Sequence, residues 1–313
     1  MSKAQWTLDR QYAEIMKNHP FGLALYRPLP LSVFSPGSCG YFDDFGSWNP
    51  ITHLENDVML TKKGLEKVPE EDALDKAPVD NGITWGPKTS ANVKATKLEL
   101  SAGIDPGLAI AIPVTVSAIY SYSVDADVGG ILLTSSPVTH EHYYHSSPFK
   151  NWSKKNAQVI LRRWPEVKKH GMWLVTSTYA AKKCAINMTV AKGRGFKVGF
   201  AAEAMGLGKL VPCGEWRRSH MDEGWGEYTT EGDDKSVVFF GGLKFKYTQM
   251  IGKDLIHVVD TPVLRGTIGS EVNIPEVIDV VPDPENEENS FMVECQKYLG
   301  EDDEEAVEQD AEW

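Results

Sequence analysis

An alternation of side chains that starts at Asn92 constrains the fold most. The run NVKATKLELSAG at 92–103 alternates between two sets of residues, and AIPVTVSAIYSYSVD at 111–125 does so again. Successive side chains of a β-strand point to opposite faces, so each run predicts a strand. The short segment between them contains glycine, aspartate and proline, the residues typical of a connection. We expect one long antiparallel hairpin over about 92–125.

Further strands follow in the second half of the chain. Residues 172–203 are rich in threonine, serine, alanine and valine, and contain a Lys-Gly-Arg-Gly bend at 192–195. This composition favours a second long hairpin. The stretch from 235 to 265 predicts closing strands, while the proline pairs and turn residues of 21–50 indicate an extended segment, a turn, a strand and a turn.

Two short helices complete the predicted fold. Residues 6–18 place Leu8, Tyr12, Ile15 and Met16 on one helical face, after a candidate N-cap at Thr7. A basic helix is predicted at about 152–170, with its centre before Pro165. The expected class is therefore α+β, with a twisted, mainly antiparallel sheet, long hairpins and a few short helices.

Composition excludes several classes of protein. The first twenty residues carry charges throughout, which argues against a secretory signal. The longest apolar stretch, at 108–116, has about half the length of a membrane-spanning helix. The cysteines at 39, 184, 213 and 295 form no CxxC pair of the kind that binds structural zinc. These features indicate a soluble cytoplasmic protein with free thiols and without a structural zinc site. No Walker loop and no nucleophile elbow occurs, so we expect no enzyme activity and no cofactor.

Charge divides the chain into unlike parts. The net charge is −12, yet residues 276–313 contain fifteen acids and one base, a net of −14, which leaves +2 on residues 1–275. Residues 150–218 hold fifteen bases and three acids. We therefore expect a largely disordered acidic tail from about residue 273 onward, which could occupy a basic surface of the same chain. A plain solubilising extension is the alternative.

The basic stretch next to Trp152, Trp164 and Trp173 is the strongest functional signal. Lysine and arginine beside tryptophan suit nucleic acid, with cations on phosphates and rings on bases, and they equally suit an anionic membrane surface. A third possibility is a metal-dependent enzyme that uses His140, His142 and His145 of THEHYYH. A true HExxH motif is absent because position 144 is Tyr.

The order of these elements resembles the gasdermin family, and in particular its fungal members. The resemblance rests on WTLDRQYAEIM, GLALYRPLPL and SPGSCGYFDDFGSWNPITHL, followed by the predicted hairpins and basic helix, and it covers about 1–265. It implies a cytoplasmic protein that moves to the plasma membrane, binds acidic phospholipids, self-oligomerises and inserts the hairpins at 92–125 and 172–203 as a β-barrel. It also implies a pore-forming body over 1–265 and lytic cell death after a protease removes an inhibitory C-terminal segment at about 266–313, with no nucleic acid as partner.

Carried onto this sequence, the resemblance assigns roles to basic and apolar residues. Headgroup contacts are expected from the basic helix and, second, from the first helix: Lys154, Lys155, Arg162, Arg163, Lys168, Lys169, Arg10 and Lys17. The tip of the second hairpin would carry Lys192, Arg194 and Lys197. The C-terminal segment is predicted to dock on the body through a helical face formed by Phe291, Cys295, Tyr298 and Leu299. The remaining alternative is a non-lytic protein that binds an anion or nucleic acid.

Overall fold

The computed structural model describes residues 3–98, 116–124, 128–189, 195–201, 225–251 and 275–298. Within these ranges the fold is α+β, and every strand pairing is antiparallel, which confirms the predicted class. The helices are few and short: α1 (Lys3–Ile15), α2 (Asp57–Lys62), the 3-10 turn η1 (Glu70–Asp72), α4 (Ser147–Arg163) and α5 (Val167–His170).

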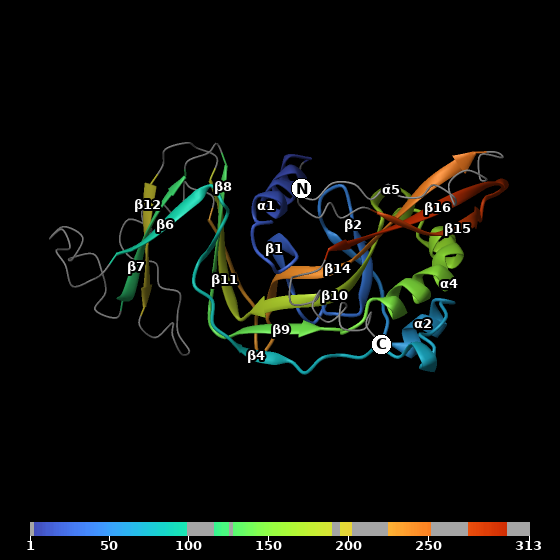
Figure 1. Cartoon of the computed structure of the whole chain (residues 1–313), viewed down its shortest axis with the longest axis horizontal. Helices are drawn as coiled ribbons and strands as arrows, with labels where there is room; N and C mark the ends of the chain where they lie inside the picture. Colours follow the sequence, from blue (N-terminus) through green and yellow to red (C-terminus); the bar gives the residue numbers. More distant parts are fainter. Residues whose placement is uncertain are drawn as a thin grey trace, which may run out of the picture.

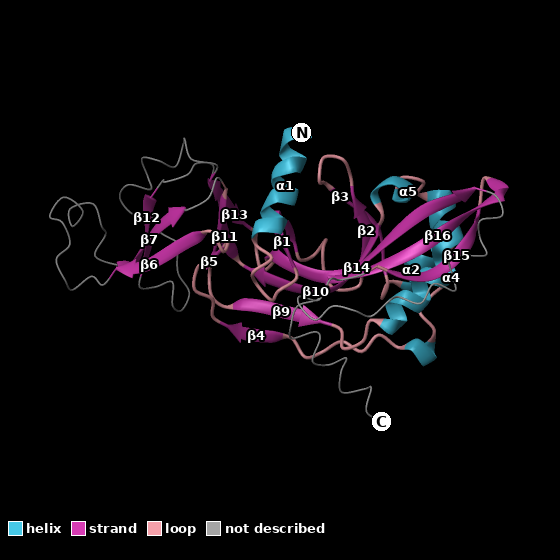
Figure 2. Cartoon of the chain, turned by 45° about the horizontal axis from the view of Figure 1, so that its top comes forward, coloured by secondary structure: helices cyan, strands magenta, loops and turns pink. Residues whose placement is uncertain are grey.

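The strands form three sheets (Figures 1 and 2). The main sheet contains nine strands: β1 (Leu23–Pro30), β2 (Ser38–Phe42), β3 (Trp48–His53), β4 (Asp80–Ile83), β9 (Val138–His142), β10 (Met172–Ala181), β14 (Ser236–Ile251), β15 (Glu276–Asp283) and β16 (Asn286–Tyr298). A second sheet contains β5 (Lys88–Thr89), β8 (Gly129–Thr134), β11 (Lys183–Thr189) and β13 (Trp225–Thr229). The third contains β6 (Val93–Leu98), β7 (Val116–Val124) and β12 (Gly195–Ala201).

Strand β14 organises the main sheet. One of its edges pairs with β10 along most of that strand, while the other pairs first with β1 and then with β16. The sequence LKFKY at 243–247 alternates apolar and basic residues, and the structure buries the apolar set. Leu243, Phe245 and Tyr247 therefore face one side of the sheet, and Lys244 and Lys246 face the other.

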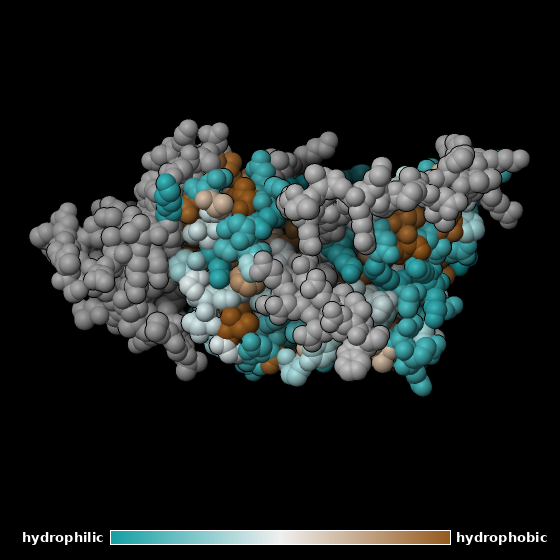
Figure 3. All heavy atoms as spheres, in the orientation of Figure 1, coloured by the Kyte–Doolittle hydropathy of each residue, from teal (hydrophilic) through white to brown (hydrophobic). Residues whose placement is uncertain are grey.

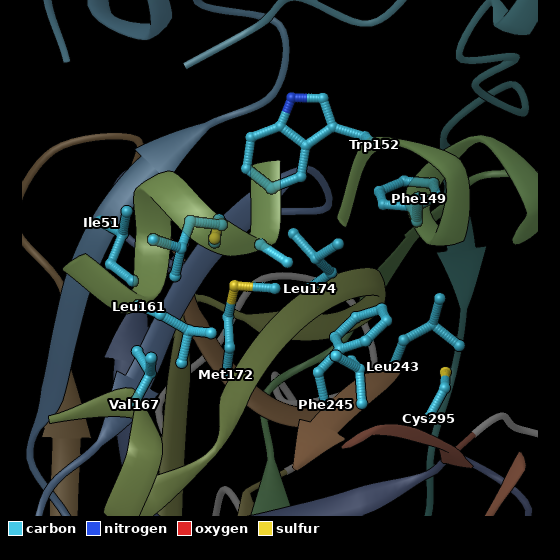
Figure 4. Packing of buried hydrophobic residues seen from close by; sticks show 14 of the residues in the cluster. Ile51, Phe149, Trp152, Leu161, Val167, Met172, Leu174, Leu243, Phe245 and Cys295 are labelled. Carbon is cyan, nitrogen blue, oxygen red and sulfur yellow. The ribbon is translucent and has the colours of Figure 1, made fainter. Parts of the chain in front are cut away.

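Helix α4 covers the side of the sheet that carries Phe245. Figure 4 shows Phe149, Trp152 and Leu161 of the helix above the side chains of β10, β14 and β16. Trp152 is fully buried, and its indole N–H donates to the carbonyl oxygen of Glu66 at 2.7 Å. This satisfies the polar atom of the largest buried ring, so the helix is fixed on the sheet by both packing and hydrogen bonding.

Helix α1 packs near the junction of the main and second sheets. Tyr12 and Met16 are fully buried, with Leu8 and Ile15 partly buried beside them, which confirms the predicted apolar face. The Arg27 guanidinium donates two hydrogen bonds to Asp9, at 3.0 and 2.7 Å, and so ties the helix to β1. The helix begins at Lys3, so Thr7 lies inside it and the predicted N-cap is wrong.

The three-stranded sheet lies at one end of the molecule, beyond β8 and β11 (Figure 1). Pairing of β6 with β7, from Val93 opposite Val124 to Leu98 opposite Ile119, confirms the predicted pairing of the strands at either end of 92–125. The second predicted hairpin is wrong. Within 172–203, β10 joins the main sheet, β11 joins β8 and β13, and β12 pairs with β7.

The C-terminal strands correct another expectation. Residues 276–298 form β15 and β16, where the sequence predicted a largely disordered segment with one helical face. Ten residue pairs join β16 to β14, from Gly242 opposite Tyr298 to Ile251 opposite Asn289. Phe291, Val293 and Cys295 are buried in the same core as Trp152. The part of the acidic segment that the structure describes is thus built into the sheet.

No helix in the described ranges has both the length and the apolar character needed to cross a membrane. The hydrophilic surface over α2 and the neighbouring end of α4 is visible in Figure 3.

Candidate functional site, a groove lined by basic residues

A groove of about 1000 Å³ lies between α1, α5 and the face of β14 opposite to α4. Besides Arg27 of β1, which is paired with Asp9, basic side chains reach it from three other parts of the chain: Arg10, Lys17, Lys168, Lys169, Lys244 and Lys246. Its apolar lining includes Phe42, Trp48, Trp173, Phe240 and Tyr298. We refer to this surface as the basic groove. Four of the predicted headgroup residues therefore share one site: Arg10 of α1, Lys17 just after α1, and Lys168 and Lys169 of α5.

Helix α1 contributes Arg10 and the nearby Lys17 to one wall. Arg10 is exposed, and Lys17 forms an ion pair with Glu14 at 2.6 Å. Both partners of that pair are more than half exposed, so the pair contributes little to stability and opens easily. The other acid of this wall, Asp9, is engaged by Arg27 at 2.7 Å. Helix α1 thus offers cations to the basic groove while its acids already have partners.

Helix α5 forms the second wall and ends beside the sheet. The Lys169 ammonium pairs with Asp44 of the β2–β3 turn, and the Lys168 ammonium lies 3.1 Å from Glu285. Gly171 ends the helix with φ of +74°, and a Cβ there would come within 2.8 Å of the Phe245 carbonyl oxygen. Only glycine fits this turn without strain, so the sequence places α5 close against β14.

The floor of the groove contains two lysines that the sequence analysis missed. Lys244 and Lys246 are two residues apart on β14 and therefore share its face. Burial lowers the pKa of Lys244, and the neighbouring charges of Lys246 and Arg10 lower it further. The Lys244 ammonium also lies 5.3 Å from the centre of the Trp173 ring. The alternation of LKFKY was the signal that could have revealed this pair.

The other predicted headgroup residues lie on α4, outside the basic groove. Lys154, Lys155, Arg162 and Arg163 are exposed along this helix. The Arg163 guanidinium donates to the carbonyl oxygen of Lys63, which fixes it at the end of α4. The α4 residues and the groove residues therefore form two basic surfaces rather than one.

The C-terminal hairpin neutralises part of the basic surface. Glu276 of β15 pairs with Lys150 of α4, and Glu285 and Asp283 lie 3.1 and 3.9 Å from the Lys168 ammonium. The Lys168 ammonium also lies 5.3 Å from the centre of the Phe291 ring. The segment therefore contacts the body by charge as well as by core packing.

Three of the four predicted docking residues have such contacts. Phe291 and Cys295 are buried in the core under α4, and the Tyr298 ring packs 5.0 Å from the ring of Trp173. Leu299 lies outside the described residues. The inhibitory role of the segment stays a prediction.

Of the three residues predicted at the hairpin tip, the structure describes Lys197. Lys192 and Arg194 lie outside the described residues. Lys197 lies near the start of β12, opposite Ser121 of β7. Its assignment to a hairpin tip stays a prediction.

The histidine cluster forms a stack of rings. His140 lies 4.1 Å from Tyr179 and 4.6 Å from His142, measured between ring centres. No group of three or more metal-ligating side chains occurs among the described residues. His140 and His142 thus occupy a packed face of β9, and the structure offers no observation in favour of a metal enzyme.

An exposed aromatic ring lies at the edge of the basic groove. Phe45, in the turn between β2 and β3, is 45% exposed. Its neighbours Asp44 and Gly46 line the groove. The Asp43 carboxylate accepts hydrogen bonds from the backbone N–H groups of Phe45 and Ser47, at 2.8 and 2.9 Å, which shape this turn and present the ring to solvent.

Comparison with models of known families finds no match, and no curated protein matches the chain. A solved structure of a bacterial gasdermin from Bradyrhizobium tropiciagri is similar over 75% of this chain and 86% of that chain, with 9% sequence identity and a TM-score of 0.27. A likeness this distant decides nothing about function. Membership of the gasdermin family, and of its fungal branch, stays a prediction.

Proposed function

We propose that this protein is a non-enzymatic, membrane-permeabilising protein that binds acidic phospholipids. The observation that carries the proposal is the convergence of Arg10, Lys17, Lys168 and Lys169 on one groove from α1 and α5. The first pair, Arg10 and Lys17, lies more than 140 positions before the second pair, Lys168 and Lys169, so their meeting is a property of the fold. Each cation near an anionic bilayer contributes about 1 kcal/mol to binding.

The exposed Phe45 ring favours a membrane over other anionic partners. Aromatic rings partition into the interface between headgroups and hydrocarbon, next to the charges that bind the headgroups. Phe45 and Lys169 occupy neighbouring elements, since the Lys169 ammonium pairs with Asp44. In the bound state the ring would enter the interface while Arg10 and the α5 lysines contact phosphates.

Permeabilisation would then require self-association and insertion of strands, as the resemblance to gasdermins implies. The three-stranded sheet at the end of the molecule supports this step, because β6 and β12 are its two outer strands and pair only with β7 among the described residues. Edges of this kind accept a further strand from another copy. In the unbound protein the C-terminal hairpin would mask Lys150 and Lys168, since Glu276 and Glu285 engage them. Because the hairpin is also part of the core, these exposed ion pairs would open at the membrane while the hairpin stays in place.

The first test measures binding to vesicles of phosphatidylserine and phosphatidylcholine by sedimentation. The double variant Arg10→Ala with Lys169→Ala should weaken binding by about 2 kcal/mol, or roughly thirtyfold, because two headgroup contacts are lost. Lys182→Ala is the matched control, since Lys182 is exposed and paired only to Asp233. Equal binding by wild type and the double variant would contradict the lipid role of the groove.

A second arm tests the alternative partner, nucleic acid. Tight binding to single-stranded DNA with a steep dependence on salt, combined with no binding to acidic vesicles, would replace the membrane proposal.

A further inference from the structure

The two lysines of β14 that line the basic groove differ in the residues around them. Both lie on the same face of the strand, because they are two positions apart. Lys246 is exposed and faces Glu294 across the β14–β16 ladder, so an acid lies opposite it. Lys244 is half-buried and faces Gln296 of β16 on one side and Trp173 of β10 on the other. Both cross-strand neighbours of Lys244 are therefore neutral.

The turn after α5 holds the stem of Lys244 in place. A Cβ on Gly171 would lie 3.4 Å from the Lys244 Cε, and the Lys244 ammonium lies 5.3 Å from the centre of the Trp173 ring. The face of the ring attracts the ammonium but does not neutralise its charge. Within the part of the chain that the structure describes, no carboxylate lies within 4.0 Å of this ammonium.

The charges around Lys244 are mainly positive. Burial lowers its pKa most, and the charges of Lys246 on the same strand and of Arg10 on α1 lower it further. The other basic residues that line the groove are Lys17, Arg27, Lys168 and Lys169, with His170 beside them. The acids of the lining already have cationic partners: Asp9, Glu14 and Asp44. An amine in such surroundings becomes neutral, and therefore nucleophilic, at a lower pH than an ordinary lysine.

We propose that Lys244 is a covalent modification site, whose amine forms an imine with an aldehyde that carries an apolar chain. The groove has a volume of about 1000 Å³, and its apolar lining would contact the chain: Phe42, Trp48, Trp173, Phe240 and Tyr298. This inference is independent of the proposed function, because it concerns one amine and needs no membrane.

The reaction needs only the amine and the aldehyde. The lone pair of the Lys244 nitrogen forms a bond to the carbonyl carbon, and a proton moves from nitrogen to the former carbonyl oxygen. The resulting hydroxyl then leaves as water, with a second proton that comes from the same nitrogen through solvent. The carbon–nitrogen double bond of the imine remains. No electron is gained or lost overall, so neither an oxidant nor a reductant takes part.

The test treats the full chain with hexanal and cyanoborohydride, which reduces each imine to a stable secondary amine, and follows each lysine by mass spectrometry of its peptides. At neutral pH Lys244 should react at least about threefold faster than Lys246, because more of its amine is neutral. In urea the two rates should become equal. The pH of half-maximal rate at Lys244 should also be lower in the folded chain than in urea.

Two further arms separate the parts of the proposal. Lys246→Gln should slow the reaction of Lys244 about twofold or more, since a neighbouring positive charge is lost, while Lys182→Gln is the matched control and should leave it unchanged. Formaldehyde has no chain, so its preference for Lys244 should be smaller than that of hexanal. Equal preferences would overturn the apolar aldehyde as the reactant. A folded chain in which Lys244 reacts no faster than Lys246 would overturn the site itself.

Discussion

Removing the C-terminal hairpin should unfold much of the body, whereas removing only the residues after it should not. A chain that ends at Ile274 lacks β15 and β16, which pack against Leu243, Phe245 and Tyr247. These three side chains are at most 6% exposed in the intact protein. Exposing an apolar side chain of this size costs about 1.5–3 kcal/mol, so the loss reaches about 5–9 kcal/mol if all three are fully exposed.

This loss is comparable to the whole stability of a typical domain, about 5–15 kcal/mol. The assay is urea denaturation followed by tryptophan fluorescence, with chains that end at Ile274 and at Tyr298. The chain ending at Tyr298 keeps all ten β14–β16 pairs and should unfold at the same urea concentration as the full chain. Equal midpoints for both truncated chains would refute the structural role of the hairpin and favour a detachable inhibitory segment.

Three further predictions concern single residues. Gly171→Ala should destabilise the protein by about 1–3 kcal/mol in urea denaturation, because its φ of +74° and the Phe245 carbonyl oxygen at 2.8 Å exclude a Cβ. Burial lowers the pKa of His19, so the folded state binds this proton less readily than the unfolded state does. The resulting contribution to the free energy of unfolding is fully present above about pH 6.5, the ordinary pKa of histidine, and it is lost as the pH falls below that value. Thermal unfolding should therefore show a smaller loss between pH 7 and pH 5 for His19→Asn than for wild type. Phe45→Ser should weaken sedimentation with acidic vesicles without changing the urea midpoint, since the ring is exposed.

Local patterns predicted the elements whose partners are close in sequence. The alternation at 93–98 and 116–124 identified β6 and β7, and the apolar face of Tyr12 and Met16 identified α1. Both follow from periodicity within one segment. The predicted hairpin at 172–203 failed because all ten residues of β10 are buried, so this strand lacks the alternation of a half-exposed strand, and its partners β9 and β14 lie elsewhere in the chain.

The C-terminal segment shows how two periodicities compete in one sequence. Phe291, Cys295 and Tyr298 fit the spacing of a helix, while Phe291, Val293 and Cys295 fit the alternation of a strand. Pairing with β14, which no local pattern reveals, decides for the strand. The same limit applies to the site. Sequence named Arg10 and Lys169 as separate candidates, but only the fold brings them to one groove with Lys244.

Release of an encapsulated dye tests the central claim most directly. Vesicles of phosphatidylserine and phosphatidylcholine would be compared with vesicles of phosphatidylcholine alone, using the full chain and the chain that ends at Tyr298. The account predicts release from the acidic vesicles only, by at least one of the two chains, and a marked reduction in the Arg10→Ala, Lys169→Ala variant but not in Lys182→Ala. Absence of release by both folded chains, or equal release from neutral vesicles, would contradict it.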